Sequence, residues 1–66
     1  MELYTVQLGK AGVDGFRLIE TSKIGASNLN AAQDRMVSLL KTRGVQIGAN
    51  RAQLLDQRDN LLREFP

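Results

Sequence analysis

Four acidic side chains with arginine neighbours are the residues of this chain that most invite a catalytic interpretation. Asp34, Asp56, Asp59 and Glu64 fall at helix-like spacings, and each lies within two positions of an arginine. A catalytic carboxylate pair needs a walled cleft that separates the two pKa values, and a chain of 66 residues can hardly wall one. A solvated, mixed-charge helix surface has the same pattern. We therefore interpret these carboxylates as surface groups.

Nucleophilic and metal-assisted chemistry find no support in the composition. The chain contains neither histidine nor cysteine, so Ser22, Ser27 and Ser38 have no base to activate them. A disulfide is ruled out, and a structural zinc site would have to be built from carboxylates alone, which zinc rarely accepts. The sequence thus predicts a protein that is not an enzyme, with no metal, no cofactor and no small-molecule substrate.

The glycine-rich stretch "GKAGVDG", residues 9–15, resembles a phosphate-binding loop only superficially. A Walker loop places its lysine directly after the last glycine and continues into a helix. Here Lys10 follows the first glycine, and a strand pattern follows the stretch. We predict a turn, which leaves Lys10 as a charge that can meet a phosphate backbone.

The arginines offer the best case for nucleic-acid binding. Nine basic residues against seven acidic ones give a net charge of +2, which permits contact with nucleic acid without requiring it. The six arginines are scattered along the chain with acids between them. Nucleic acid is therefore kept as the alternative partner.

The first third of the chain alternates in the way that strands do. In "ELYTVQL" the side chains of Tyr4, Val6 and Leu8 share one face, and "FRLIETS" places Phe16 and Leu18 together in the same manner. The two stretches predict a β-hairpin over about residues 2–22, with a loop longer than the tight two-residue type.

The remainder of the chain has helical spacing. The segment "LNAAQDRMVSLLKTRG" carries one apolar stripe and predicts a helix over about residues 28–43, ended by Gly44. Asn50 and Gln53 have the spacing of a capping box, and the leucine pairs that follow predict a second helix over about residues 50–64. We expect a single small domain, residues 1–66, of the α+β class: an N-terminal β-hairpin followed by an antiparallel two-helix hairpin (ββαα).

So small a domain is marginally stable, and without a disulfide or metal it favours a partner chain. The main prediction is a non-enzymatic interaction or assembly protein that binds a protein partner or a second copy, as a phage or appendage part or a small inhibitor. No apolar run is long enough to span a membrane and no signal peptide is evident, so the cytoplasm or a virion is the expected location. The expected partner-binding residues are Met36, Leu39, Leu40, Leu54, Leu61, Leu62 and Phe65.

Two resemblances accompany these patterns. A strand followed by "LNAAQDRMVSLLKTRG" and "NRAQLLDQRDNLL" resembles the ribbon-helix-helix repressors, a family of dimeric DNA-binding transcriptional regulators. This resemblance implies that Arg17, Ile19 and Thr21 read bases and that Arg51, at a helix start, contacts phosphate. The stretch "LLDQRDNLLRE" is similar to a packed helix of the flagellar hook–filament junction protein, which adds weight to an assembly role.

Overall fold

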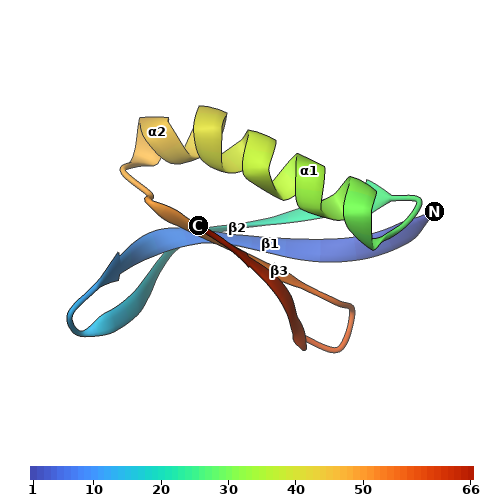
Figure 1. Cartoon of the computed structure of the whole chain (residues 1–66), viewed down its shortest axis with the longest axis horizontal. Helices are drawn as coiled ribbons and strands as arrows, with labels where there is room; N and C mark the ends of the chain where they lie inside the picture. The colour runs from blue at the N-terminus through green and yellow to red at the C-terminus, as the bar shows by residue number, and fades with distance from the viewer.

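A four-stranded antiparallel sheet carries a helix across one of its faces in the computed structural model, which describes all residues 1–66 (Figure 1). The elements are β1 (Glu2–Gly12), β2 (Gly15–Ala26), α1 (Leu29–Leu39), η1 (Leu40–Gly44), α2 (Val45–Ile47), β3 (Arg51–Leu55) and β4 (Leu61–Phe65). The strand order is β2-β1-β3-β4, so the helix connects two strands that flank β1 on either side.

The N-terminal β-hairpin is confirmed, although it is longer and tighter than the sequence predicts. Its ladder runs from the Glu2–Ala26 pair to the Gly12–Gly15 pair, which leaves only residues 13–14 in the turn. The prediction of a longer loop is wrong because Gly15 adopts a positive φ of 103°, which glycine takes without steric cost. The chain therefore reverses at once.

A helix is present where the first helical stripe predicts it, but it continues past the expected end. The segments α1, η1 and α2 follow one another without a break, from the Asn28 cap, whose Oδ1 accepts a hydrogen bond from the main chain of Ala31 at 2.8 Å. The prediction that Gly44 ends the helix is wrong, because Gly44 is helical and buried beneath Leu40. The left-handed terminator is Gly48, with φ of 79°.

The second predicted helix does not exist, and the ββαα prediction is therefore wrong. Residues 51–65 form the antiparallel β3–β4 hairpin, and β3 pairs with the centre of β1. The strand-helix-helix order that a ribbon-helix-helix protein requires is absent for the same reason. Asn50 caps no helix: its side-chain amide accepts from the main-chain nitrogen of Ala11 at 2.7 Å and donates to the oxygen of Ala11 at 3.3 Å.

The turn at residues 56–60 explains why the leucine pairs do not belong to one helix. The side chain of Asp56 accepts hydrogen bonds from the main-chain nitrogens of Arg58 and Asn60, at 2.8 and 2.9 Å. These bonds hold the pKa of Asp56 below its ordinary value, chiefly through Asn60. Asp59 adopts a left-handed φ of 64°, which no helix interior contains.

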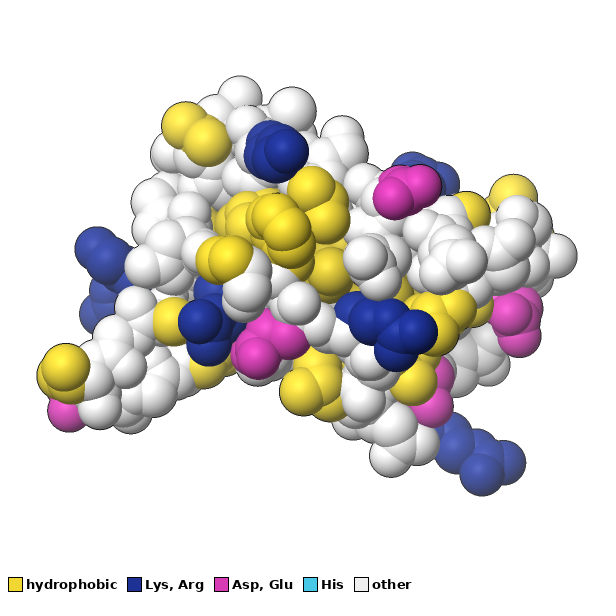
Figure 2. Space-filling view, viewed as in Figure 1, with side chains coloured by type: hydrophobic (Ala, Val, Ile, Leu, Met, Phe, Trp, Pro, Cys, Tyr) yellow, Lys and Arg dark blue, Asp and Glu magenta, His cyan; other side chains and the backbone are white.

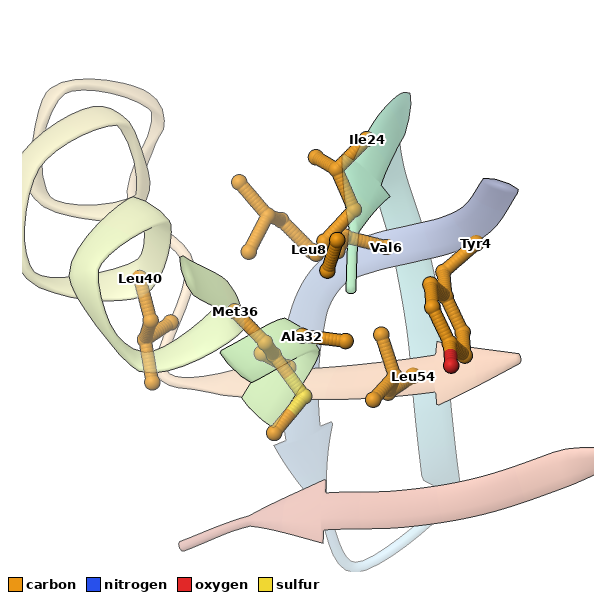
Figure 3. Packing of buried hydrophobic residues seen from close by; sticks show 10 residues of the cluster. Tyr4, Val6, Leu8, Ile24, Ala32, Met36, Leu40 and Leu54 are labelled. Carbon is orange, nitrogen blue, oxygen red and sulfur yellow. The ribbon is translucent and has the colours of Figure 1, made fainter. Parts of the chain in front are cut away.

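The hydrophobic core lies between the helix and the sheet (Figure 3). Alternate residues of β1 and β3 point toward the helix, and one residue from each successive turn of the helix packs against them. The exposed surface of the chain is 4299 Å², close to the roughly 4,200 Å² expected for a folded monomer of this mass. The core residues drawn and labelled are Tyr4, Val6, Leu8, Ile24, Ala32, Met36, Leu40 and Leu54.

Candidate interaction surface

The single helix covers only part of the sheet. A helix with its side chains is about 10 Å wide, whereas four strands spaced about 4.8 Å apart make a sheet about 19 Å wide. The helix packs against β2, β1 and β3, so it is centred over β1. The edge strand β4, drawn in red in Figure 1, lies next to β3 at the edge of the sheet, farther from β1 than the strands that the helix packs against.

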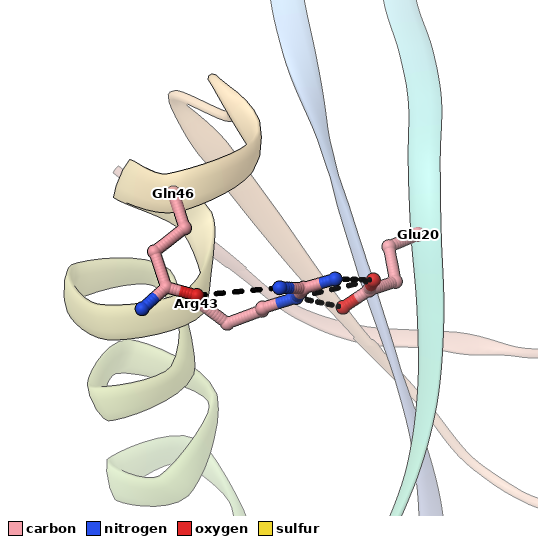
Figure 4. Close-up of polar contacts among 3 residues, drawn as sticks. All are labelled: Glu20, Arg43 and Gln46. Carbon is pink, nitrogen blue, oxygen red and sulfur yellow. Dashed lines mark hydrogen bonds and ion pairs between the residues drawn. The ribbon is translucent and has the colours of Figure 1, made fainter.

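Polar contacts tie one side of the helix to β2 (Figure 4). Arg43 donates from Nη2 and Nε to the two carboxylate oxygens of Glu20, at 2.8 and 3.0 Å, and from Nη1 to Oε1 of Gln46 at 3.2 Å. The hydrogen bonds from Arg43 lower the pKa of Glu20. About two turns earlier, Arg35 donates to the main-chain oxygen of Gly25 at 2.8 Å.

The opposite side of the helix lies over β3, beyond which β4 forms the edge of the sheet, and it carries Val37 between Gln33 and Lys41. Val37 lies about 100° around the helix from the buried Met36, away from the side that contacts β2, and packs at the margin of the core. On β4, Phe65 pairs with Ala52 and so points to the helix face of the sheet. Leu62 lies at a bulge in β4 and also packs against the core.

We call Val37, Leu62 and Phe65 the β4 seam. All three side chains are half-buried, and Figure 2 shows hydrophobic side chains gathered between the helix and the front strand, with basic side chains above and below them and an acidic side chain between the basic ones below. Lys41 lies one helical turn after Val37, and Arg63 lies on β4 opposite Leu54. Neither cation takes part in an ion pair, so two unpaired cations lie at the border of the seam.

The second face of the sheet has no helix over it, and it mixes polar side chains with the exposed leucines Leu3, Leu18 and Leu61. Lys23 donates to the hydroxyl of Thr5 at 2.8 Å, and Gln53 donates to Glu64 at 2.8 Å. Arg51 lies 3.8 Å from the same Glu64 carboxylate. These bonds satisfy the side chains locally, as in antiparallel sheets that face water on one side.

The expected partner-binding residues are spread over several places in this fold. Met36, Leu40 and Leu54 are inside the chain's own core. Leu39 lies four positions from both Arg35 and Arg43, hence on the β2 side of the helix. Leu61, which is 55% exposed, pairs with Leu55 on the second face of the sheet, away from the helix.

Of that set, the seam contains only Leu62 and Phe65. Its third member, Val37, was missed as a candidate residue, although it adjoins the apolar stripe in the sequence. The position of β4 beside Val37 depends on strand order, which no local pattern reveals.

The expected nucleic-acid residues lie mostly on β2. Arg17 and Thr21 are exposed, and Ile19 occupies the bulge where β2 has one residue more than β1. Arg51 begins β3, opposite Gly9 of β1. The structure thus places three of the four residues on an edge strand and separates Arg51 from them by the width of β1.

Shallow hollows offer no catalytic arrangement. The hydroxyl of Tyr4 donates to Glu2 at 3.1 Å, beside a hollow of about 260 Å³. Burial raises the pKa of Tyr4 and the Glu2 carboxylate raises it further, so the phenol is protonated at neutral pH. No three acidic, histidine or cysteine side chains converge as metal ligands would.

Comparison with known protein families, curated proteins and solved structures finds no match to this chain. None of its helical segments combines the length and apolar character needed to span a membrane.

Proposed function

We propose that this protein is a small, non-enzymatic interaction protein that binds a protein partner by taking a helix of that partner onto the β4 seam. The observation that carries the proposal is the half-buried apolar surface of Val37, Leu62 and Phe65, above a strand that the chain's own helix leaves uncovered.

The spacing of the sheet suits a second helix. The chain's own helix is centred over β1, and β4 is two strands away in the order β2-β1-β3-β4, which is about 9.6 Å at a strand spacing of 4.8 Å. Packed helices lie about 8–10 Å apart. A partner helix over β4 would thus contact both the sheet and the side of α1 that carries Val37.

The charges at the border of the seam indicate which charges the partner helix should carry. Lys41 on the helix and Arg63 on β4 lie on the two sides of the seam, and neither has an ion-pair partner within the chain. An amphipathic helix with an apolar stripe and acidic residues beside it complements this arrangement.

A second copy of the chain is a poor source for this helix. The core side of the chain's only long helix is occupied by its own sheet, as the burial of Ala32 and Met36 requires. The outward side presents mainly polar or charged side chains such as Asp34 and Thr42. The partner is therefore a different protein, and self-association is a competing outcome of the test.

The test uses a displayed library of amphipathic helical peptides, selected for binding to the purified protein. Val37→Glu removes the apolar side of the seam, and Val45→Glu is the matched control, because Val45 is on the same helix but 72% exposed. Lys41→Glu changes only the border. We expect selected peptides with acidic flanks to bind the wild type and the Val45→Glu protein, and to lose at least tenfold in affinity for Lys41→Glu and Val37→Glu.

Thermal melts show whether Val37→Glu remains folded, and Lys41→Glu supplies the result if it does not. Selected peptides that bind both Lys41→Glu and Val37→Glu as tightly as the wild type would refute the seam as the contact surface. A concentration-dependent dimer in sedimentation, dispersed by Val37→Glu, would instead assign the seam to self-association and overturn the choice of partner.

A further inference from the structure

The β1–β2 hairpin extends past the rest of the sheet as a free two-stranded ribbon. Pairing of β3 with β1 ends at Gly9, whereas pairing of β2 with β1 continues to Gly12. In Figure 1 this end of the hairpin hangs away from the helix. Residues 10–17 therefore project about 10 Å at the rise of an antiparallel strand.

Two cations face each other on this ribbon. Lys10 and Arg17 are directly paired across the two strands, so their side chains leave the same face. Both are exposed, and neither takes part in a side-chain hydrogen bond or an ion pair. Like charges in this position destabilise a strand pair. An anion bound beside them would reverse that effect.

The ribbon is held in place before any ligand arrives. The side chain of Asn50 makes both hydrogen bonds to the main chain of Ala11, at 2.7 and 3.3 Å, and so continues the pairing where β3 ends. The ring of Phe16 lies over Gly9, where a methyl group would come within 2.5 Å of it. A fixed ribbon loses little conformational entropy on binding.

We propose that the ribbon of residues 10–17 binds duplex nucleic acid, with Lys10 and Arg17 on backbone phosphates and the tip directed into the major groove. That groove is about 12 Å wide and 8.5 Å deep and admits a two-stranded ribbon. The projection of about 10 Å matches this depth.

The tip carries groups suited to the floor of a groove. Val13 is fully exposed and offers apolar contact to thymine methyl groups. Asp14 beside it would be repelled by phosphates, but at the tip it faces base edges, where a carboxylate accepts from cytosine N4. The flanking residues Gly12 and Gly15 add no side chains to the width of the tip.

Other anionic partners fit this ribbon less well. Binding to a protein surface relies on a buried apolar centre, and stable attachment to an anionic membrane takes a larger cluster of basic residues or an apolar anchor. Val13 is the only exposed large apolar side chain of the ribbon, and Lys10 and Arg17 are its only two cations. Acidic polypeptides and anionic vesicles therefore serve as competing probes.

The test is fluorescence anisotropy with a labelled duplex DNA of random sequence. The double variant Lys10→Gln/Arg17→Gln removes the cation pair. The control Lys23→Gln/Arg58→Gln makes the same change in net charge at exposed positions outside the ribbon and the seam. Two phosphate contacts predict that the wild type loses about twelvefold in affinity between 50 and 200 mM salt. We expect the ribbon variant to bind at least tenfold more weakly at 50 mM salt with a flattened salt dependence, and the control to bind within threefold of wild type.

Three results would overturn the inference. These are no binding of DNA at 50 mM salt, an equal loss in the ribbon variant and the control, or binding to polyglutamate or anionic phospholipid vesicles as tight as that to DNA. The seam and the ribbon do not share residues, so Val37→Glu leaves DNA binding unchanged whether or not the seam binds a helix.

Discussion

Asp59 distinguishes a strand–turn–strand structure from a helix by the sign of a stability change. Its φ of 64° places it in the left-handed region, which costs an ordinary L-residue about 1–2 kcal/mol. Glycine avoids that cost but loses about 0.5–1 kcal/mol more backbone entropy on folding. The Asp59→Gly variant should therefore be more stable than the Asp59→Ala variant by about 0.5–1 kcal/mol.

A helix over residues 50–64 would reverse this order. Alanine is the best helix former and would stabilise, whereas glycine is about 0.3–0.5 kcal/mol worse than aspartate in a helix interior. Urea unfolding of the two variants beside wild type, followed by circular dichroism, measures the differences directly. Stabilisation by alanine together with destabilisation by glycine would refute the turn at residues 56–60.

Three further substitutions test the contacts that hold the sheet and helix together. Gly9→Ala should destabilise the protein by about 1–3 kcal/mol, because the added methyl group meets both an aromatic ring and a main-chain oxygen, whereas Gly12→Ala meets nothing within 4 Å; equal melting temperatures would contradict the close approach. Asn50→Ala should cost about 1 kcal/mol and speed amide exchange at the base of the ribbon, and unchanged exchange would speak against the bridge between β1 and β3. The pair with Arg43 lowers the pKa of Glu20 below its ordinary value of 4.5. The pair therefore stabilises the folded protein above pH 4.5, and this stabilisation is lost as the pH falls through the lowered, folded-state pKa. Glu20→Gln should therefore flatten the melting temperature between pH 6 and pH 3, and a curve that parallels wild type would exclude a role for the Arg43 pair.

The sequence predicts the N-terminal hairpin and the long helix because their patterns admit one interpretation. Tyr4, Val6 and Leu8 alternate with period two, and Met36 and Leu40 repeat at one helical turn. In both elements the apolar positions are the ones that the core buries. The prediction that Gly44 ends the helix is wrong because a glycine can also serve close packing inside a helix, and here Gly44 packs beneath Leu40.

The prediction of a helix in the C-terminal segment is wrong because doublets of leucine fit both the helical period and the strand period. Leu54 and Leu55 form a helical stripe with the pair at residues 61–62, but in a strand they also serve the two faces of a sheet. Leucine, arginine and glutamate favour a helix locally, so pairing with β1, a contact distant in the sequence, decides the outcome. The stretch "DQRDN" contains the one local signal for a turn, since aspartate and asparagine cap turns with their side chains.

The candidate surface could be predicted only in part for the same reason. Leu62 and Phe65 emerge from the sequence as partner-binding residues, but as members of a helix face. Their place beside Val37 follows from the strand order, which leaves β4 at an edge beyond the helix. Once the second helix becomes a hairpin, the wide apolar face is divided between the core and the seam.

The seam and the function proposed for it require β4 to lie beside β3 at the uncovered edge of the sheet, and nuclear Overhauser spectroscopy of the free protein tests that most directly. We predict main-chain contacts between Ala52 and Phe65 and between Val6 and Leu54, the pairs that join β4 to β3 and β3 to β1. Consecutive contacts between residues three apart throughout 51–65, with no cross-strand contacts, would indicate a helix. That result would contradict the sheet, the seam and the function proposed for it.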